Sequence, residues 1–216
     1  MIDRDRLLVL PQYLAPQHAL SRAIRWATRQ PWSTRLIPAF CGRFKVDLSE
    51  AARPLEDYRS FNDFFTRRLK DGARPIANGA GVLACPADGA VSQLGSVVDS
   101  QLLQAARNVP YLYARNERLV LLGKTPFGPA AMVLVGAMLV GSMSIEGFEL
   151  EPLAEAATRM EKRTLSPPLA YAQGEEVGRF NMGSTVILVL PPGAPAWPAE
   201  LAPGASVRMG ARLAGS

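Results

Sequence analysis

The feature that most constrains the fold is a series of short apolar segments, separated by glycine and proline, that begins at Val82. Short apolar segments with this spacing are typical of β-strands. The residues before Val82 have helical periodicity instead, so helices come first and strands follow. This order predicts an α+β fold. The predicted strands cover residues 81–85, 90–94, 119–122, 132–140, 185–190 and 206–209.

Two segments near the N-terminus have the pattern of amphipathic helices. The first covers residues 17–29 and the second follows Pro31, with Trp26 and Trp32 beside them. A basic amphipathic helix with tryptophan suits the surface of an anionic membrane. An ordinary surface helix with solvated arginines has the same pattern, so both interpretations stay open.

A third helix is predicted over residues 60–70. Ser60 is placed as its N-cap, with Asp63 three residues later in the first turn. Phe61, Phe64 and Phe65 then share one side, which we interpret as a stripe that faces the core. No residue pattern here indicates a nucleotide or cofactor site.

The charge of the chain is concentrated at one end. The net charge is +5, but residues 1–46 alone hold eight Lys or Arg and two acidic residues, a balance of +6. The basic excess therefore lies in the segment for which a membrane surface and an ordinary solvated helix both stay open, and no nucleic acid is expected as a partner. The opening residues have no cleavable signal peptide pattern. The two cysteines, Cys41 and Cys85, are far apart in sequence, so neither a disulfide framework nor a metal site is expected.

Gly183 and Ser184 stand where a turn of small residues enters the β-branched run Val186–Leu190. The length and composition of this run predict a strand covered on both faces, with Ser184 at its start. Gly183 can take backbone angles that a Cβ would forbid. A lone Gly-Ser-Thr is most often a turn capped by a hydroxyl, so other motifs must decide whether this serine carries chemistry.

Several motifs, in order and in combination, resemble phosphatidylserine decarboxylase proenzymes, and the likeness covers most of the chain. The longest is the phenylalanine-rich segment at 61–70, followed by Arg-Pro-Ile at 74–76. The others are Pro-Ala-Asp-Gly at 86–89, Asn-Val-Pro at 108–110, Ala-Arg-Asn-Glu-Arg at 114–118, Gly-Glu-Glu-Val-Gly-Arg-Phe at 174–180 and Gly-Ser-Thr at 183–185.

The resemblance implies a fold and a reaction. Membrane-associating helices (1–76) would precede a β-rich catalytic core of barrel-sandwich hybrid type (77–216). Self-cleavage between Gly183 and Ser184 would give a β chain (1–183) and an α chain (184–216). Ser184 would be the nucleophile and the precursor of a covalent pyruvoyl cofactor, which decarboxylates phosphatidylserine to phosphatidylethanolamine. Asp88 would be the carboxylate of an Asp-His-Ser triad, and no metal is implied.

The chain departs from the family pattern at the base of that triad. Family members carry a histidine between the motifs that match 86–89 and 108–110, whereas residues 91–107 contain none and His18 is the chain's single histidine. Gln173 also stands where the family usually has lysine. An alternative is therefore a catalytically impaired relative that only binds a membrane or a partner chain. A third alternative, a biotinyl- or lipoyl-type carrier, is disfavoured because the four lysines lack its signature.

The resemblance also implies partners and a location. The expected partners are an anionic phospholipid membrane, phosphatidylserine and the chain's own cleaved piece, with a homodimer as a further option. The expected location is the cytoplasmic side of the cell membrane, as a peripheral protein of phospholipid biosynthesis.

Overall fold

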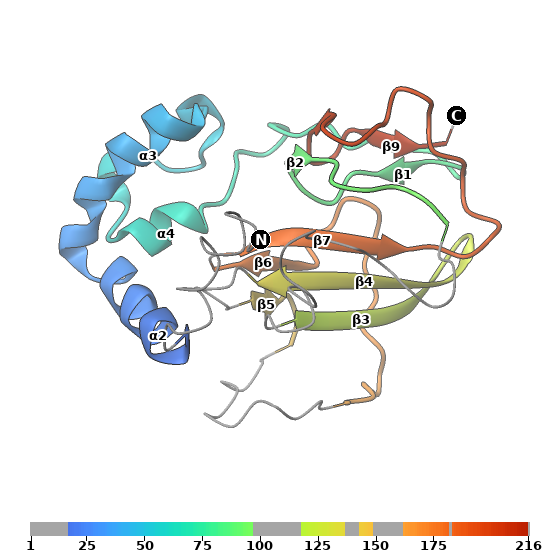
Figure 1. Cartoon of the computed structure of the whole chain (residues 1–216), viewed down its shortest axis with the longest axis horizontal. Coiled ribbons are helices and arrows are strands. Elements are labelled where there is room, and N and C mark those ends of the chain that lie inside the picture. The colour runs from blue at the N-terminus through green and yellow to red at the C-terminus, as the bar shows by residue number, and fades with distance from the viewer. Residues whose placement is uncertain (1–16, 97–117, 137–142, 149–161, 182, 216) are drawn as a thin grey trace, which may run out of the picture.

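The computed structural model describes residues 17–96, 118–136, 143–148, 162–181 and 183–215. The helices lie together at one end of the molecule and the strands form the rest (Figure 1). The predicted α+β class is thereby confirmed. None of the helices in the described part of the chain is long and apolar enough to cross a membrane.

The N-terminal helices agree closely with the sequence pattern. The predicted helix over 17–29 is present and ends one residue early, at Thr28. The second segment is a 3-10 helix that continues into an α-helix. Pro31 and Pro38 each lie at the start of a helix, where a missing N–H removes no helical hydrogen bond. The helices are α2 (Gln17–Thr28), η1 (Pro31–Leu36), α3 (Ile37–Phe44), η2 (Leu48–Glu50), η3 (Leu55–Asp57) and α4 (Phe61–Phe65).

The helix predicted over 60–70 is correct at its start and wrong at its end. Ser60 is the N-cap as predicted, and its hydroxyl accepts a hydrogen bond of 3.1 Å from the Asp63 amide. The helix ends at Phe65, because the following residues turn back to pair with a distant segment. Leu69 forms an antiparallel bridge with Ala51, and flanking backbone hydrogen bonds join residues 68 and 70 to 52 and 50.

The core of the helical end is aromatic. Phe61 and Phe64 of α4 pack with Ile37 and Tyr58, and Phe64 is completely buried. Phe65 is half-buried against the same cluster. The prediction that the phenylalanine stripe faces the core is therefore confirmed.

Ser33 ties η1 to α4 through a buried hydroxyl. Its Oγ accepts a hydrogen bond of 2.8 Å from the Phe61 amide and lies 2.6 Å from the carbonyl oxygen of Gln30 and 3.0 Å from that of Thr28. A buried amide left without an acceptor costs about 1–3 kcal/mol. We expect Ser33→Ala to lower the free energy of unfolding by about this amount in urea titrations. Thr34→Ala, which removes an exposed hydroxyl, is the control, and equal losses in the two variants would contradict the prediction.

The strands pair antiparallel in four small sheets within the described residues. One has three strands in the order β3-β4-β7, and the others are the pairs β1-β9, β2-β8 and β5-β6. β4 is therefore the central strand of the largest sheet. The strands are β1 (Leu83–Ala84), β2 (Gly89–Ala90), β3 (Arg118–Thr125), β4 (Gly128–Gly136), β5 (Met143–Ile145), β6 (Gly178–Phe180), β7 (Gly183–Val189), β8 (Ser206–Val207) and β9 (Arg212–Ala214).

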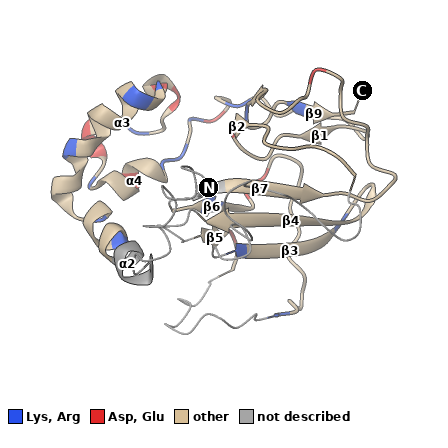
Figure 2. Cartoon of the chain, in the orientation of Figure 1, with Lys and Arg blue, Asp and Glu red and all other residues tan. Residues whose placement is uncertain are grey.

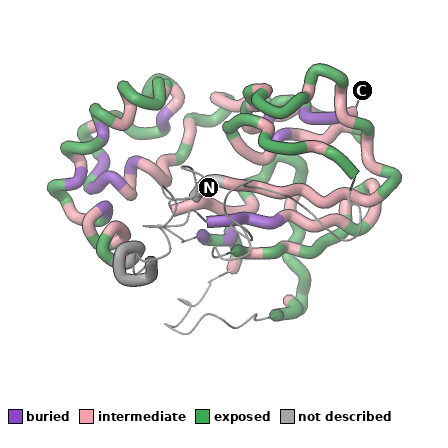
Figure 3. The backbone as a smooth tube through the Cα atoms, in the orientation of Figure 1, coloured by how far each residue is buried: buried purple, intermediate pink, exposed green. Residues whose placement is uncertain are grey.

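Burial in the strand region is concentrated on the second half of β4 (Figure 3). Leu134 packs there with Met143 and Ile145 of β5. The prediction that the run 186–190 is covered on both faces is wrong: these residues are only half-buried. β7 is also an edge strand, because it pairs with β4 on one side and has no second strand partner in the described part of the sheet.

Each of the six predicted strand segments contains or overlaps a strand, although β1, β2 and β8 are only two residues long. The predicted segment 132–140 lies in β4 up to Gly136, and residues 137–140 are outside the described part. Three strands were not predicted, namely β5, β6 and β9. Each has three residues, which is too short for an alternating pattern to be visible.

Candidate active site

Gly183 and Ser184 are the first two residues of β7, and the ladder to β4 is irregular at this point. Thr185 pairs with Val135 and Gly183 pairs with Gly136. Val135 and Gly136 are adjacent in β4, whereas Ser184 stands between Gly183 and Thr185 in β7. Ser184 is therefore the extra residue of a β-bulge. Bulges occur next to active sites, where they redirect a side chain out of the regular pleat.

The segment that leads into this bulge is held on both sides. Upstream, Phe180 at the end of β6 pairs with Met143 of β5. Gly178, at the start of β6, passes so close to the Ser144 carbonyl that a Cβ would collide with it. Between β6 and β7, the Asn181 carbonyl accepts a hydrogen bond of 2.8 Å from the side-chain amide of Asn62 in α4. The helical end of the molecule thus reaches the predicted cleavage segment.

Asp88 lies in a bend just before β2, and both of its carboxylate oxygens are occupied. Oδ1 accepts a hydrogen bond of 2.8 Å from the Met209 amide, and Oδ2 lies 3.0 Å from the Arg74 guanidinium. The Asp88 carboxylate therefore joins two segments that are far apart in the sequence. Its backbone partner is 121 residues away, because the chain near β8 and β9 returns beside β1 and β2.

Arg74 is the centre of an ion-pair cluster that includes Asp88. Its guanidinium pairs with Glu50 as well as with Asp88, and Glu50 also pairs with Arg208. Arg74 and Glu50 are largely buried, with side-chain exposures of 12% and 14%. The hydrogen bond to Glu50 raises the pKa of Arg74 above its ordinary value, against the opposing effect of burial. The sequence contained Arg74 within a family motif but gave no sign of this role.

Within the described part of the structure, no contact joins the two predicted catalytic residues, Asp88 and Ser184. The described contacts of the Asp88 carboxylate are with Arg74 and Met209, and the Ser184 side chain is outside the described part of the structure. The side chain of His18, in α2, and residues 97–107 are outside it as well. The pairing of Asp88 with Ser184 stays a prediction.

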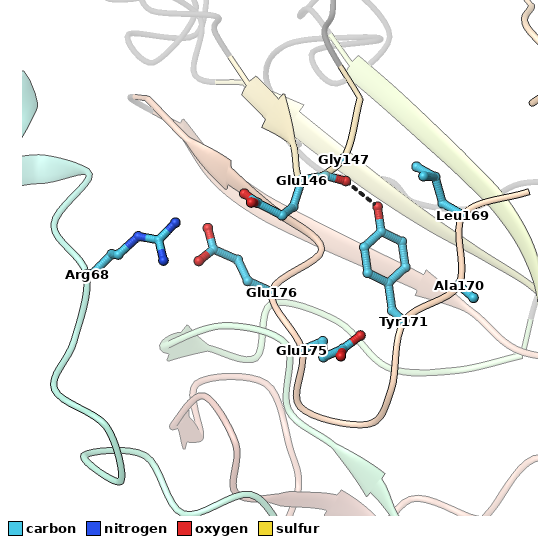
Figure 4. Close-up of a pocket in the computed structure, with 8 residues that line it drawn as sticks. All are labelled: Arg68, Glu146, Gly147, Leu169, Ala170, Tyr171, Glu175 and Glu176. Carbon is cyan, nitrogen blue, oxygen red and sulfur yellow. Dashed lines mark hydrogen bonds between the residues drawn. The ribbon is translucent and has the colours of Figure 1, made fainter.

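A pocket of about 370 Å³ lies beside the paired strands β5 and β6, and no predicted site residue lines it (Figure 4). The Tyr171 hydroxyl donates a hydrogen bond of 2.7 Å to the Glu146 carbonyl across it. Burial, followed by the nearby Glu146, raises the pKa of Tyr171. The lining residues are Arg68, Glu146, Gly147, Leu169, Ala170, Tyr171, Glu175 and Glu176.

Gln173, close in sequence to this pocket, serves the packing of the chain. Its amide nitrogen donates to the carbonyl oxygens of Ala77, at 3.0 Å, and Val82, at 3.2 Å. It therefore joins the segment before β6 to the segment before β1. Within the described residues, no three His, Cys, Asp or Glu side chains are grouped so that they could hold a metal ion.

The chain matches the family model described as phosphatidylserine decarboxylase over residues 61–111 and 104–215, and a second model described as PSD over residues 7–45. It is 36% identical to a phosphatidylserine decarboxylase proenzyme of Pseudomonas aeruginosa (strain LESB58), with 99% of this chain and 98% of the relative covered. A proenzyme of the same name from Albidiferax ferrireducens is also 36% identical, with 97% of each covered, and one from Methylococcus capsulatus is 34% identical, with 96% of each covered.

The alignment with the Pseudomonas relative is longer than the chain itself. It runs over 284 positions against 216 residues, so at least 68 positions have no residue in this chain. The match to the family model is in two parts, which overlap at residues 104–111 of this chain. The match is therefore interrupted at that point. Despite this internal difference, the match covers nearly the whole of this chain and of its relatives. The chain therefore belongs to the phosphatidylserine decarboxylase family.

Proposed function

We propose that this chain is a proenzyme that cuts itself between Gly183 and Ser184 and then decarboxylates phosphatidylserine. The observation that carries the proposal is the bulge at Ser184, where the residues on both sides have partners on β4 and the serine has none. A serine released from the regular ladder directly after a glycine is suited to attack the carbonyl in front of it. Family membership supports the same reading, because the relatives are named as proenzymes of a decarboxylase.

The proposed cleavage uses atoms of the chain and one water molecule. The Ser184 hydroxyl oxygen attacks the Gly183 carbonyl carbon, the C–N bond breaks, the nitrogen takes up a proton, and an ester replaces the amide. Removal of the Ser184 α-proton then expels the Gly183 carboxylate and leaves a dehydroalanine. This group tautomerises to an imine, and water converts the imine to a ketone with loss of ammonia. The ketone supplies the electron sink that decarboxylation of an amino acid needs.

A second candidate function is favoured by the chain's departures from its relatives. Activation of the Ser184 hydroxyl and removal of its α-proton both need a base. The family histidine is missing from this chain, in which at least 68 aligned positions have no residue. Asp88, the proposed triad carboxylate, already has both oxygens engaged. The alternative is therefore a catalytically impaired relative that binds a membrane or a partner chain without reacting.

Intact-mass analysis of the purified wild-type protein separates the two candidates. The proenzyme proposal expects two pieces, residues 1–183 and a C-terminal piece that starts with a pyruvoyl group at position 184. It also expects carbon dioxide release from phosphatidylserine vesicles. A protein that stays at its full mass of 23.3 kDa and does not react with a carbonyl reagent would favour the impaired relative instead.

The two pieces are proposed to stay together as a β/α heterodimer. The support lies in the strand pairing, because every described strand after the cut pairs with a strand before it. β7 pairs with β4, β8 with β2 and β9 with β1. We also propose that this core has the barrel-sandwich hybrid form and that it begins after residue 76, where the helical region ends. A homodimer is a further part of the proposal.

The helical end is proposed to bind the cytoplasmic face of an anionic membrane. Large apolar side chains are exposed there, with Trp26 and Phe44 both 63% exposed and Trp32 51% exposed. Basic residues lie along the same helices (Figure 2). Apolar side chains beside positive charges favour the interface of anionic lipids.

Co-sedimentation with vesicles tests this membrane proposal. We expect the protein to sediment with vesicles that contain phosphatidylglycerol and to stay in solution with phosphatidylcholine alone. Replacing both Trp26 and Trp32 with alanine should weaken sedimentation, because each removes an exposed ring that would enter the interface. Binding that does not depend on lipid charge or on either tryptophan would contradict the proposal.

A further inference from the structure

Asn62 connects two parts of the chain that the sequence separates by 119 residues. Its side-chain Nδ2 donates a hydrogen bond of 2.8 Å to the Asn181 carbonyl oxygen. Asn181 lies between β6 and β7, two residues before Gly183. The bond therefore restrains the peptide unit between residues 181 and 182, two peptide units upstream of the proposed scissile bond.

The helix that carries Asn62 is firmly held. α4 has only five residues, but Ser60 caps its start, and Phe61 and Phe64 are buried in the aromatic core. At its other end, the Thr66 hydroxyl donates 2.9 Å to the Asn62 carbonyl oxygen. Because its backbone is fixed by these contacts, Asn62 can hold the Asn181 carbonyl in one orientation.

The cleavage segment is thus fixed from three directions. β6 is paired with β5 before Asn181, and β7 is paired with β4 on both sides of Ser184. The Asn62 bond adds the third restraint and comes from the helical end of the molecule. We infer that Asn62 is a positioning residue for self-cleavage, which rests on the proposed function.

The physical reason is that attack of a hydroxyl on an amide tolerates little error in geometry. The hydroxyl oxygen must approach the carbonyl carbon to about 3–3.5 Å at the correct angle, and a shift of about 1 Å can lower the rate by about 100-fold. Gly183 has no side chain of its own to restrict its backbone. A restraint two residues upstream therefore limits how far the scissile carbonyl can turn away.

The test compares Asn62→Asp with Arg53→Gln. Asn62→Asp keeps the shape of the side chain and replaces the donor nitrogen with a carboxylate oxygen. Arg53→Gln also removes a polar contact of α4, the ion pair with Asp63, but touches no residue of the cleavage segment. We expect Asn62→Asp to slow the appearance of the two pieces roughly 10- to 100-fold in intact-mass time courses. Arg53→Gln should cleave at the wild-type rate.

A second readout separates positioning from stability. Hydroxylamine cuts the ester that forms before elimination, so the amount cut in a short pulse reports how much folded protein has made the acyl shift. Asn62→Asp should lower this amount at urea concentrations where both variants are fully folded. If the wild type cleaves, and Asn62→Asp shows the same hydroxylamine-cut amount and the same cleavage rate as the wild type, the inference about Asn62 fails while the proposed function stands. It also fails if Arg53→Gln slows cleavage as much as Asn62→Asp does. A wild type that never cleaves would overturn the proposed function as well.

Discussion

Replacing Ser184 with alanine is expected to leave a single chain of 216 residues and 23.3 kDa under all conditions in which the wild type is cut. The hydroxyl is the only group in the proposal that forms a bond to the Gly183 carbon, so its loss removes the reaction path. The loss of a nucleophile of this kind lowers rates by more than roughly 1,000-fold. Intact-mass analysis over several days measures the effect, and carbon dioxide release should disappear with it.

The matched control is Thr185→Val at the next position. It removes a neighbouring hydroxyl but keeps the β-branched shape, so the pairing of residue 185 with Val135 should persist. This variant should be cut like the wild type. Cleavage of Ser184→Ala at the same peptide bond would show that a contaminating protease, and not the chain, makes the cut.

Among the substitutions proposed here, Arg74→Met is expected to lower the free energy of unfolding most. The substitution leaves Glu50, which is only 14% exposed, with Arg208 as its ionic partner, and Arg208 is itself 62% exposed. Removing one partner of a buried ion pair costs about 3–5 kcal/mol when the remaining charge has no other partner. Because Glu50 keeps the exposed Arg208, we expect a loss at the lower end, about 3 kcal/mol. Urea unfolding in the Ser184→Ala background, where cleavage cannot interfere, measures the loss.

Two further variants test whether burial is the cause. Arg53→Gln breaks an ion pair whose side chains are 44% and 30% exposed and should cost only about 1 kcal/mol. Adding Glu50→Gln to Arg74→Met should recover part of the stability, since the buried charge is then gone. If Arg74→Met costs no more stability than Arg53→Gln, burial does not make the Arg74 cluster more stabilising than an exposed ion pair.

Patterns within one segment of the chain could be predicted from the sequence, and pairings between segments could not. The helix over 17–29, the Ser60 cap and the long strands β3, β4 and β7 follow from local periodicity and capping. The predicted C-terminal end of α4 is wrong, because the bridge between Leu69 and Ala51 determines where the helix stops.

The candidate site divides in the same way. The motif resemblance singled out Gly183, Ser184 and Asp88, and the family membership it implied is confirmed. The contacts that hold the site are between distant residues: Asp88 with Met209, Arg74 with Glu50, and Asn62 with Asn181. No spacing or composition signals such contacts, because each side chain is an ordinary surface type until the fold brings its partner near.

The pairing of β7, β8 and β9 with strands of the upstream piece has a consequence for the cut protein. A single chain unfolds and refolds as one molecule, so its folding equilibrium does not depend on how much protein is present. Once cut, the two pieces separate on unfolding and must find each other again, so the midpoint of unfolding rises with protein concentration. Self-cleavage would turn a unimolecular fold into an obligate assembly whose parts were never synthesised apart.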